Sequence, residues 1–349
     1  MDDTVVIIPA YQPTDELTEL ANSLYSMGFR IVIVDDGSGE EYSKIFDKVE
    51  AYATVIGYEK NMGKGYALRY GIDFIVKEKP YFKYLITVDS DGQHTEDAVR
   101  TISAKIHKQG GIVIGQRDTK KCNLTKFESV SCACIRTFYA LLTGMYIRDI
   151  QSGLRAFEFS YLEHLTYIKG DGFDYETNVL TDAAKRRVPI STVKISTCEI
   201  QTTAKARSHY NMSDFYAQFL ALLRVGYPSL LAQLANILCI LIIAGVTGAH
   251  LTGTVGAVLL GGYIGTALSV FLNNKIGYED NADGILSYNR ILMGILRMFA
   301  YVLFMVIFHN MLGIGLILSL ILTMCATALV EVKVMSSGLD SDLRVLARE

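Results

Sequence analysis

The stretch YLITVDSDGQHTED, residues 84–97, joins a short apolar run to a cluster of polar side chains. Its first five residues have the composition of a buried strand, and Asp89, Asp91 and Gln93 then follow at alternate positions. In an open α/β sheet, ligands bind in the crevice outside the carboxyl ends of the strands. The stretch therefore indicates a strand that ends at the rim of a binding site.

Apolar strands and amphipathic helices alternate through the first part of the chain. After an apolar run at 4–8, Leu17, Leu20 and Leu24 repeat at the spacing of one helix face. The expected strands are 4–8, 31–36, 54–58, 84–89 and 111–115, and further helices are expected over about 64–78 and through Val99, Ile102 and Ile106. This order predicts an α/β fold with a mostly parallel, Rossmann-like sheet.

Two more polar clusters follow predicted strands, at 35–38 and 61–65. Neither cluster contains a Walker or G-x-G-x-x-G phosphate-binding loop. Asp89 and Asp91, two positions apart just beyond a strand, can hold a hard cation such as Mg²⁺ or Mn²⁺ and leave positions open for phosphate oxygens. Gln93 adds a neutral oxygen at the next alternate position. The three residues are the predicted metal ligands.

The second part of the chain is strongly apolar. Residues 229–272 contain no Asp, Glu, Lys or Arg, and residues 291–330 contain only Arg297. A membrane-spanning helix needs about 20 apolar residues, so each tract is long enough for two. The expected spans are about 229–249, 253–272, 291–310 and 312–331. The alternative is a buried helical core in a soluble protein.

The membrane prediction divides the chain into four parts. We expect a cytoplasmic domain over 1–210, an interfacial helix and linker over 211–228, a membrane domain over 229–335 and a flexible cytoplasmic tail over 336–349. Basic residues flank the first span, the middle loop and the C-terminus, which places both termini and that loop in the cytoplasm. The N-terminus lacks the basic start and long apolar run of a signal peptide. The expected location is the cell membrane, with possible oligomerisation through the spans.

Charge and cysteine content exclude other classes. The net charge of −3 gives no indication of a nucleic-acid partner. The six cysteines include no C-x-x-C pair, and Cys132 and Cys134 would point to different faces of a helix over 129–143. Free thiols are therefore the better interpretation.

Several motifs occur in an order and at spacings that resemble a known family. They are VVIIPAY, VDDGS, NMGKGYALRYGI, VDSDGQH, IGQR and DIQSGLRAF, and they lie within residues 4–225. Together they resemble the family 2 glycosyltransferases of the dolichyl- or polyprenyl-phosphate sugar synthase type, which have a GT-A fold. The apolar remainder, with FLNNK at 271–275, resembles GtrA-like membrane domains.

The resemblance implies a role for each matching residue. Pro9 and Tyr11 would line the nucleotide pocket, Asp36 would bond the base, and Asn61, Gly63 and Lys64 would shape the loop that binds the nucleotide-sugar donor. Asp89, Asp91 and Gln93 would hold Mg²⁺ or Mn²⁺ on the diphosphate. Arg117, Lys126 and Ser131 would bind the acceptor phosphate, and Arg155 would bind it or position its loop. Asp91 and Arg117 are the predicted catalytic residues.

The chain departs from the family pattern at two places. Gln12-Pro13 stands where members usually show Asn-Glu, whose Glu grips the ribose. Phe127 stands where an Arg is expected before Ser131, and the neighbouring Lys126 supplies the charge without a bidentate fork.

The expected function is inverting transfer of a hexose, from a donor of the UDP-glucose or GDP-mannose type, to undecaprenyl or dolichyl phosphate for cell-surface glycan assembly. UDP-glucose is the preferred donor. One alternative is translocation or scaffolding of a lipid-linked sugar by the spans, with a non-catalytic soluble domain. A processive polysaccharide synthase would carry a Gln-x-x-Arg-Trp motif, and this chain has no Trp.

Overall fold

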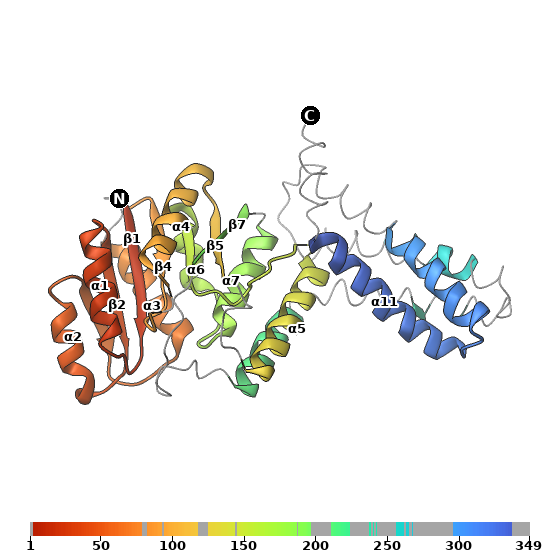
Figure 1. Cartoon of the computed structure of the whole chain (residues 1–349), viewed down its shortest axis with the longest axis horizontal. Coiled ribbons are helices and arrows are strands. Elements are labelled where there is room, and N and C mark those ends of the chain that lie inside the picture. Colours follow the sequence, from red (N-terminus) through yellow and green to blue (C-terminus); the bar gives the residue numbers. More distant parts are fainter. Residues whose placement is uncertain are drawn as a thin grey trace. The chain divides into compact units, whose positions relative to one another are not determined.

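The structure is a computed structural model. It describes residues 3–78, 82–92, 94–117, 125–143, 145–186, 188–196, 211–223, 237, 238, 240, 242, 256–261, 263, 264, 267 and 296–336. The chain forms two compact units (Figure 1). The first comprises residues 1–135 and 147–221, and the second comprises residues 136–146 and 222–349.

A mixed sheet forms the centre of the first unit. Within the described residues it has seven strands in the order β3-β2-β1-β4-β6-β5-β7. The strands are β1 (Thr4–Ala10), β2 (Arg30–Asp36), β3 (Thr54–Tyr58), β4 (Tyr84–Thr87), β5 (Ile112–Gln116), β6 (Arg155–Glu158) and β7 (Ile190–Lys194). All neighbouring pairs are parallel except those of β6, which runs antiparallel to β4 and β5. The predicted α/β fold with a mostly parallel sheet is confirmed.

Helices cover both faces of this sheet. The helices between residues 16 and 185 are α1 (Glu16–Ser26), η1 (Glu40–Tyr42), α2 (Ser43–Val49), α3 (Lys64–Glu78), α4 (Glu96–Gln109), α5 (Lys126–Thr143), α6 (Phe159–Tyr167) and α7 (Asp174–Lys185). Thr95 begins α4 as its N-cap, because its side chain accepts a hydrogen bond from the Ala98 N–H. The predicted helix over 64–78 coincides with α3.

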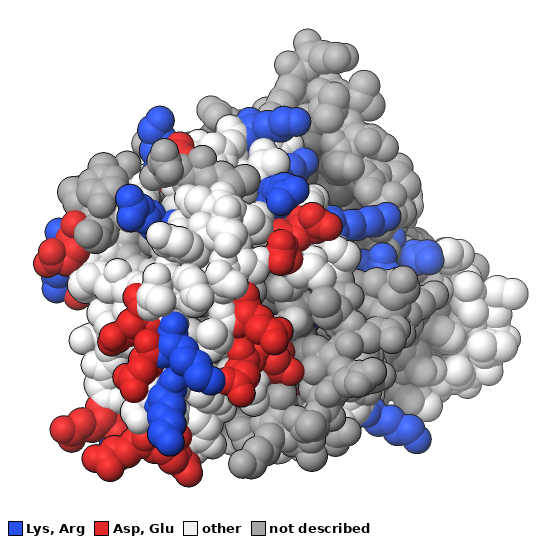
Figure 2. Space-filling view, turned by 60° about the vertical axis from the view of Figure 1, so that its left-hand side comes forward, with Lys and Arg blue, Asp and Glu red and all other residues white. Residues whose placement is uncertain are grey.

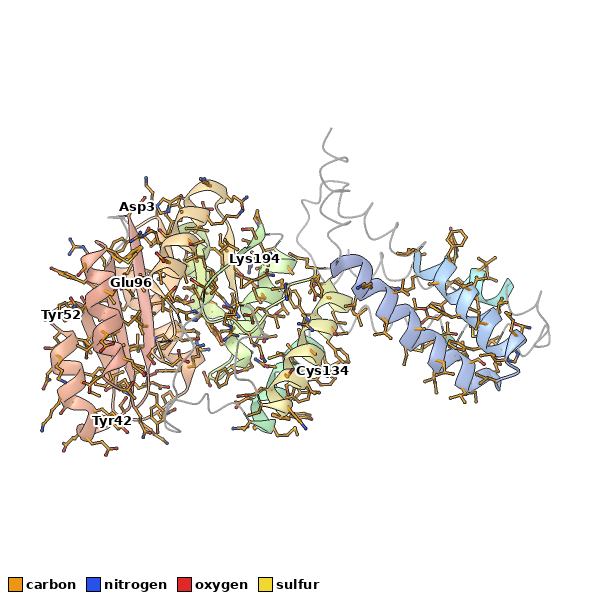
Figure 3. All side chains as sticks on the ribbon, viewed as in Figure 1. Asp3, Tyr42, Tyr52, Glu96, Cys134 and Lys194 are labelled. Carbon is orange, nitrogen blue, oxygen red and sulfur yellow. The ribbon has the colours of Figure 1, made fainter. Side chains whose placement is uncertain are left out.

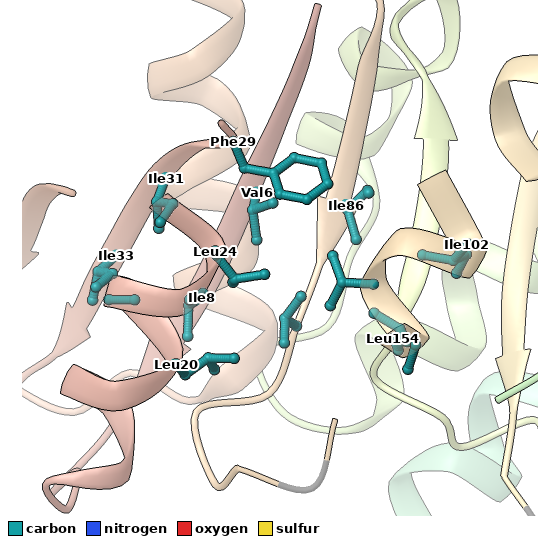
Figure 4. Packing of buried hydrophobic residues seen from close by; sticks show 14 of the residues in the cluster. Val6, Ile8, Leu20, Leu24, Phe29, Ile31, Ile33, Ile86, Ile102 and Leu154 are labelled. Carbon is teal, nitrogen blue, oxygen red and sulfur yellow. The ribbon is translucent and has the colours of Figure 1, made fainter. Parts of the chain in front are cut away.

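The core on one face joins α1, α2 and α4 to alternate residues of the strands (Figure 4). Val6 and Ile8 of β1 point to this face, and Leu20 and Leu24 of α1 pack against them. On the opposite face α3 lies close to the sheet, because a Cβ at Gly71 would stand 2.3 Å from Ile7 Cδ1. The alternation of strand side chains thus fills two apolar layers.

Two strands were absent from the sequence prediction. β6 has only four residues, and β7 carries Ser191 and Thr192 among its apolar residues. Because β6 is inserted antiparallel between β4 and β5, Ala156 is paired with both Ile86 and Val113. The insertion places the DIQSGLR motif, residues 149–155, beside the ends of β4 and β5.

The second unit is mostly helical where it is described. Residues 296–305 are helical, a π-helical turn follows at Val306–Met311, labelled η2, and α11 spans Leu316–Ser336. Tyr301, Met305 and Leu320 belong to one buried cluster of this unit. Among the described residues, no helix is both long and apolar enough to cross a membrane. The first two predicted spans and the tail lie largely outside the described residues.

Candidate active site

The polar clusters meet at the topological switch point of the sheet. The chain passes from β1 to β2 and β3 on one side and returns to β4 on the other, so the carboxyl ends of β1 and β4 border the crevice that α/β folds use for ligands. Pro9 is buried in β1, and Tyr11, just beyond it, is 39% exposed. Gln12 has a φ of 49°, and its N–H donates to Ser38 Oγ at 2.9 Å. A non-glycine residue in this region is uncommon, and here the bond to Ser38 holds the backbone in that conformation.

Asp36, at the end of β2, organises the neighbouring loop. Its Oδ1 accepts hydrogen bonds from the Tyr58 hydroxyl and the Met62 N–H, each at 2.8 Å, and its Oδ2 accepts one from the Gly63 N–H at 3.0 Å. Burial and the bond to Asp36 raise the pKa of Tyr58. Asp36 is only 3% exposed, and these contacts hold the 61–63 loop. Its expected bond to the base of the nucleotide stays a prediction.

Residues 168–172 form hydrogen bonds with the loop and first turn that begin α3. The carbonyl of Asp171 accepts hydrogen bonds from the N–H groups of Gly65 and Tyr66, at 2.8 and 3.1 Å. Gly63 has a φ of 97°, and a Cβ there would lie 2.5 Å from the same carbonyl. Arg69 of α3 bonds the carbonyl of Gly170. The predicted donor loop is therefore fixed in its backbone, whereas Asn61 is exposed on it.

Lys64 lies between two carboxylates. Its Nζ is 2.7 Å from Asp89 Oδ1 and 3.2 Å from Glu176 Oε2, and it stands over the ring of Phe173, 5.7 Å from the centroid. Burial by itself would lower the pKa of Lys64, but Asp89 and Glu176 outweigh it and raise that pKa. Burial would likewise raise the pKa of Asp89, but Lys64 and His94 hold it well below the ordinary range. Both groups are therefore charged at neutral pH.

The carboxylate of Asp89 is confined on its other sides. A Cβ at Gly153 would come within 2.2 Å of Asp89 Oδ2, so only glycine leaves room there. Asp89 Oδ2 also faces Nε2 of His94 at 3.6 Å, and that ring is buried with neither nitrogen hydrogen-bonded. Asp91 is half-buried in the turn that follows, which Gly92 continues with a φ of 72°. Gln93 lies outside the described residues.

The residues at the end of β4 fit a divalent ion that shares its ligands with a substrate. Within the ranges that the structure describes, no three His, Cys, Asp or Glu side chains converge as a complete metal site. Mg²⁺ is commonly bound by one or two carboxylates together with substrate phosphates. The ionised Asp89 and the adjacent Asp91 are two carboxylates at the end of β4, a donor set of that size.

Arg117, beyond β5, is held by a carboxylate that the sequence did not single out. Its Nε is 2.7 Å from Asp149 Oδ2, and one of its terminal nitrogens donates to Asp149 Oδ1 at 3.0 Å. Asp149 is 5% exposed and begins the DIQSGLR motif. This bidentate pair fixes the plane of the guanidinium, so Asp149 determines the direction in which Arg117 points.

Arg155 is a scaffold residue. Its guanidinium donates to the carbonyls of Ser152, Glu176 and Ile150, at 2.9, 2.8 and 2.9 Å, and the residue is 1% exposed. These contacts support the role of positioning the motif's loop, and binding of the acceptor phosphate by Arg155 stays a prediction.

The remaining acceptor candidates lie on α5. Lys126 is exposed at its first position, and Ser131 is 2% exposed further along. Cys132 hydrogen-bonds Gln151 of the motif, and Cys134 is a second free cysteine of this helix (Figure 3).

The face shown in Figure 2 carries acidic and basic side chains interspersed, with acidic ones gathered in its lower part.

The sequence did not identify two of the carboxylates in this site. Glu176 contacts Lys64 from α7, in the segment YETNVL, and Asp149 contacts Arg117 from the first position of DIQSGLR. Both lie more than thirty residues from their partners along the chain. Asp149 stands in one of the motifs that resemble the family, whereas Glu176 stands in none of them. Residue spacing does not reveal either pairing, because contacts at this separation follow from the sheet order.

The α/β part of the chain is similar to known proteins. Residues 5–166 match the family model "Glycosyl transferase family 2". UDP-N-acetylglucosamine–dolichyl-phosphate N-acetylglucosaminyltransferase of Methanococcus voltae is 30% identical over 218 residues, which are 55% of this chain and 84% of the relative. Dolichyl-phosphate beta-glucosyltransferase of Saccharomyces cerevisiae is 25% identical over 258 residues, or 64% and 74% of the two chains.

Among solved structures, glucosyl-3-phosphoglycerate synthase from Mycobacterium tuberculosis, in complex with Mn²⁺, UDP and phosphoglyceric acid, aligns with a TM-score of 0.49 at 15% identity. That alignment covers 64% of this chain and 78% of the synthase. The family match and the relatives, taken together with the site at the switch point, show that this chain is a glycosyltransferase and belongs to glycosyl transferase family 2.

Proposed function

We propose that this glycosyltransferase moves a hexose from a nucleotide sugar to the phosphate of a polyprenyl lipid. The observation that carries the proposal is the similarity to two relatives whose names specify dolichyl phosphate, one of which is covered over 84% of its length. The names of these relatives specify two different sugars. The preferred donor remains UDP-glucose, with a GDP-mannose type as the alternative.

The chemistry of the acceptor agrees with the residues at the site. A phosphate monoester has a second pKa near about 6, so polyprenyl phosphate is largely dianionic at neutral pH and attacks the anomeric carbon without a protein base. The enzyme then supplies positioning and charge stabilisation. A single displacement inverts the anomeric centre, so an α-linked donor gives a β-linked product.

Asp89, Asp91 and Gln93 would hold the divalent ion, Mg²⁺ or Mn²⁺. When bound, the ion neutralises charge on the departing nucleoside diphosphate. Tyr11, Asn61 and Gly63 border the donor crevice, and Asp36 maintains the shape of its loop through the contacts described above.

Arg117, Lys126 and Ser131 are the proposed acceptor residues. Arg117 is aimed by its bidentate bond to Asp149, and Lys126 is exposed at the start of α5. The ammonium of Lys126 brings a positive charge, and both a guanidinium and an ammonium can donate hydrogen bonds to phosphate oxygens. Arg155 acts at a distance from the phosphate by holding the loop at 150–152.

Membrane attachment belongs to the same proposal. The apolar tracts at 229–272 and 291–330 would form four spans of a GtrA-like domain, with the catalytic unit and both termini in the cytoplasm. The helix over 212–223 exposes Met212 and Tyr216, which suits a position in the membrane interface. After alkaline carbonate washing, the chain should stay in the membrane fraction, and its release into the supernatant contradicts the spans.

The activity test uses membranes that contain the full chain, with Mg²⁺ or Mn²⁺ and undecaprenyl or dolichyl phosphate. Radiolabelled UDP-glucose, UDP-galactose, UDP-N-acetylglucosamine and GDP-mannose are offered separately. One donor should give a labelled product that partitions into organic solvent, and Asp91→Ala should abolish it. If no donor labels the lipid while the wild-type chain is folded, the proposed acceptor is wrong.

A further inference from the structure

The contact between Lys64 and Asp89 places a cation of the protein on a carboxylate that would bind a metal ion. Lys64 Nζ is 2.7 Å from Asp89 Oδ1, and each side chain is only 21% exposed. Glu176 offers the same ammonium a second carboxylate at 3.2 Å. The ammonium is therefore bound between two carboxylates. Asp89 is a proposed metal ligand, and Glu176 is not.

The backbone around Lys64 and Asp89 is held by packing and hydrogen bonds, whereas the side chain of Lys64 has rotatable bonds. Asp89 packs directly on Gly153, where even a methyl group would not fit. The backbone on both sides of Lys64 is held, because Gly63 bonds Asp36 and Gly65 bonds Asp171. A lysine ammonium is a compact charge on a flexible four-carbon stem. A metal ion that binds Asp89 would therefore displace the ammonium of Lys64, and the carboxylate would keep its position.

We propose that Lys64 is a built-in competitor of the divalent ion, which makes metal binding at Asp89 depend on the diphosphate of the donor. Without a nucleotide, the ammonium occupies Asp89 Oδ1 and repels a second cation. When the diphosphate enters, its oxygens and Glu176 accept the ammonium, and Asp89 becomes available to the metal. The inference rests on the metal site of the proposed function and extends it to the order of binding.

The charges of the cluster support this coupling. Asp89 and Glu176 carry two negative charges, and Lys64 and Arg155 carry two positive charges, with Arg155 Nε 3.9 Å from Glu176 Oε1. With Asp91, the other carboxylate proposed for the metal, the cluster carries one net negative charge, so a divalent ion alone would leave one positive charge in excess in a mostly buried place. A diphosphate removes that excess. By linkage, the factor by which the nucleotide strengthens metal binding equals the factor by which the metal strengthens nucleotide binding.

The test measures Mn²⁺ binding to the detergent-solubilised full chain from the electron paramagnetic resonance signal of free Mn²⁺. Titrations are made without nucleotide and with UDP or GDP present. Lys64→Met removes the competing charge, Lys64→Arg keeps it, and Lys60→Met serves as a matched control because Lys60 is exposed on the same loop. Lys64→Gln is a second neutral variant, used if the methionine variant unfolds at a lower temperature than the wild type.

Without nucleotide, the neutral variants should bind Mn²⁺ at least tenfold more tightly than the wild type. The enhancement by UDP or GDP should shrink by a similar factor. Lys64→Arg and Lys60→Met should behave as the wild type does. Equal Mn²⁺ affinity of the wild type and both neutral variants without nucleotide, with nucleotide-dependent binding intact, overturns this inference alone. Absence of Mn²⁺ binding to every protein, with and without nucleotide, overturns the metal site of the proposed function as well.

Discussion

Asp36 is the last residue of β2 and Asp89 lies two residues beyond the end of β4, so both stand at the carboxyl ends of strands, yet their contacts differ in kind. Asp36 accepts hydrogen bonds from two backbone N–H groups and a tyrosine hydroxyl, and it is 3% exposed. Asp89 is paired with the ammonium of Lys64 and faces an imidazole, and it is 21% exposed.

The difference shows how one residue type serves two purposes in a site. A carboxylate bonded to backbone N–H groups cannot change partners unless the chain moves, so Asp36 maintains the shape of the loop. A carboxylate bonded to a flexible side chain can exchange that partner for a ligand, so Asp89 is available for chemistry. Changes at the two positions should therefore separate stability from activity.

The largest expected effect is on the rate of sugar transfer. Asp89→Asn should lower kcat/KM at least about 100-fold, the size of effect seen when one group that stabilises transition-state charge is removed. The free energy of unfolding should fall by only about 1 kcal/mol, because the amide oxygen still accepts a hydrogen bond from Lys64 and Glu176 remains as the charged partner of the ammonium. Transfer of label to lipid and thermal unfolding measure the two effects.

Asp73→Asn is the matched control for this change, because Asp73 forms an exposed ion pair with Lys77 on the surface of α3. It should leave both transfer and stability unchanged. If Asp89→Asn retained more than a tenth of wild-type activity, Asp89 would belong to the scaffold, and the contrast with Asp36 would disappear.

The next largest effect is on stability. Asp36→Ala should lower the free energy of unfolding by about 2–3 kcal/mol, because it removes the buried acceptor shared by the Tyr58 hydroxyl and the N–H groups of Met62 and Gly63. Urea denaturation followed by circular dichroism measures this change. Asp47→Ala, at an exposed position of α2, should change stability little. Equal stability of the two variants would show that water replaces the carboxylate of Asp36.

The sequence predicted the elements that depend on local pattern. The boundaries of α3 and the strand at 54–58 coincide with those observed, because their periodicity and their ends are written in neighbouring residues. It also located the acidic ends of β2 and β4. It could not assign partners, since Asp36 and Asp89 carry the same side chain at similar positions relative to their strands.

Long-range pairing accounts for what the sequence missed. Residue spacing gives no indication that Glu176 approaches Lys64, 112 positions away. It also does not indicate that Asp149 accepts two hydrogen bonds from the guanidinium of Arg117. These contacts depend on β6, a four-residue strand that runs against its neighbours and that local pattern did not predict. Arg155 is an example. It is a charged residue in a motif, and the structure shows that its guanidinium donates to three backbone carbonyls, which local pattern did not predict.

A smaller effect is expected at the glycine of the loop held by Asp36. Gly63→Ala should cost about 1–3 kcal/mol of unfolding free energy, because its φ of 97° is strained for alanine and the Cβ would meet the Asp171 carbonyl. Gly28 shares a positive φ of 84° but has open space around it. Gly28→Ala should therefore show only the cost of the backbone conformation. If the two variants unfold alike, the segment at 168–172 does not constrain the loop.

The smallest expected effect is the pH dependence of the Asp89 pair. The pKa of Asp89 is lowered in the folded protein, so its contribution to stability is fully present above the unfolded carboxyl pKa of about 3.9 and is lost as the pH falls through the lower, folded value. The difference in unfolding free energy between the wild type and Asp89→Asn should therefore be level from pH 8 to pH 5 and should narrow only below about pH 4. Urea denaturation at each pH, without divalent ions, measures the difference. If it already narrows between pH 7 and pH 5, Asp89 is protonated there, and the ammonium of Lys64 is not the partner that keeps it charged.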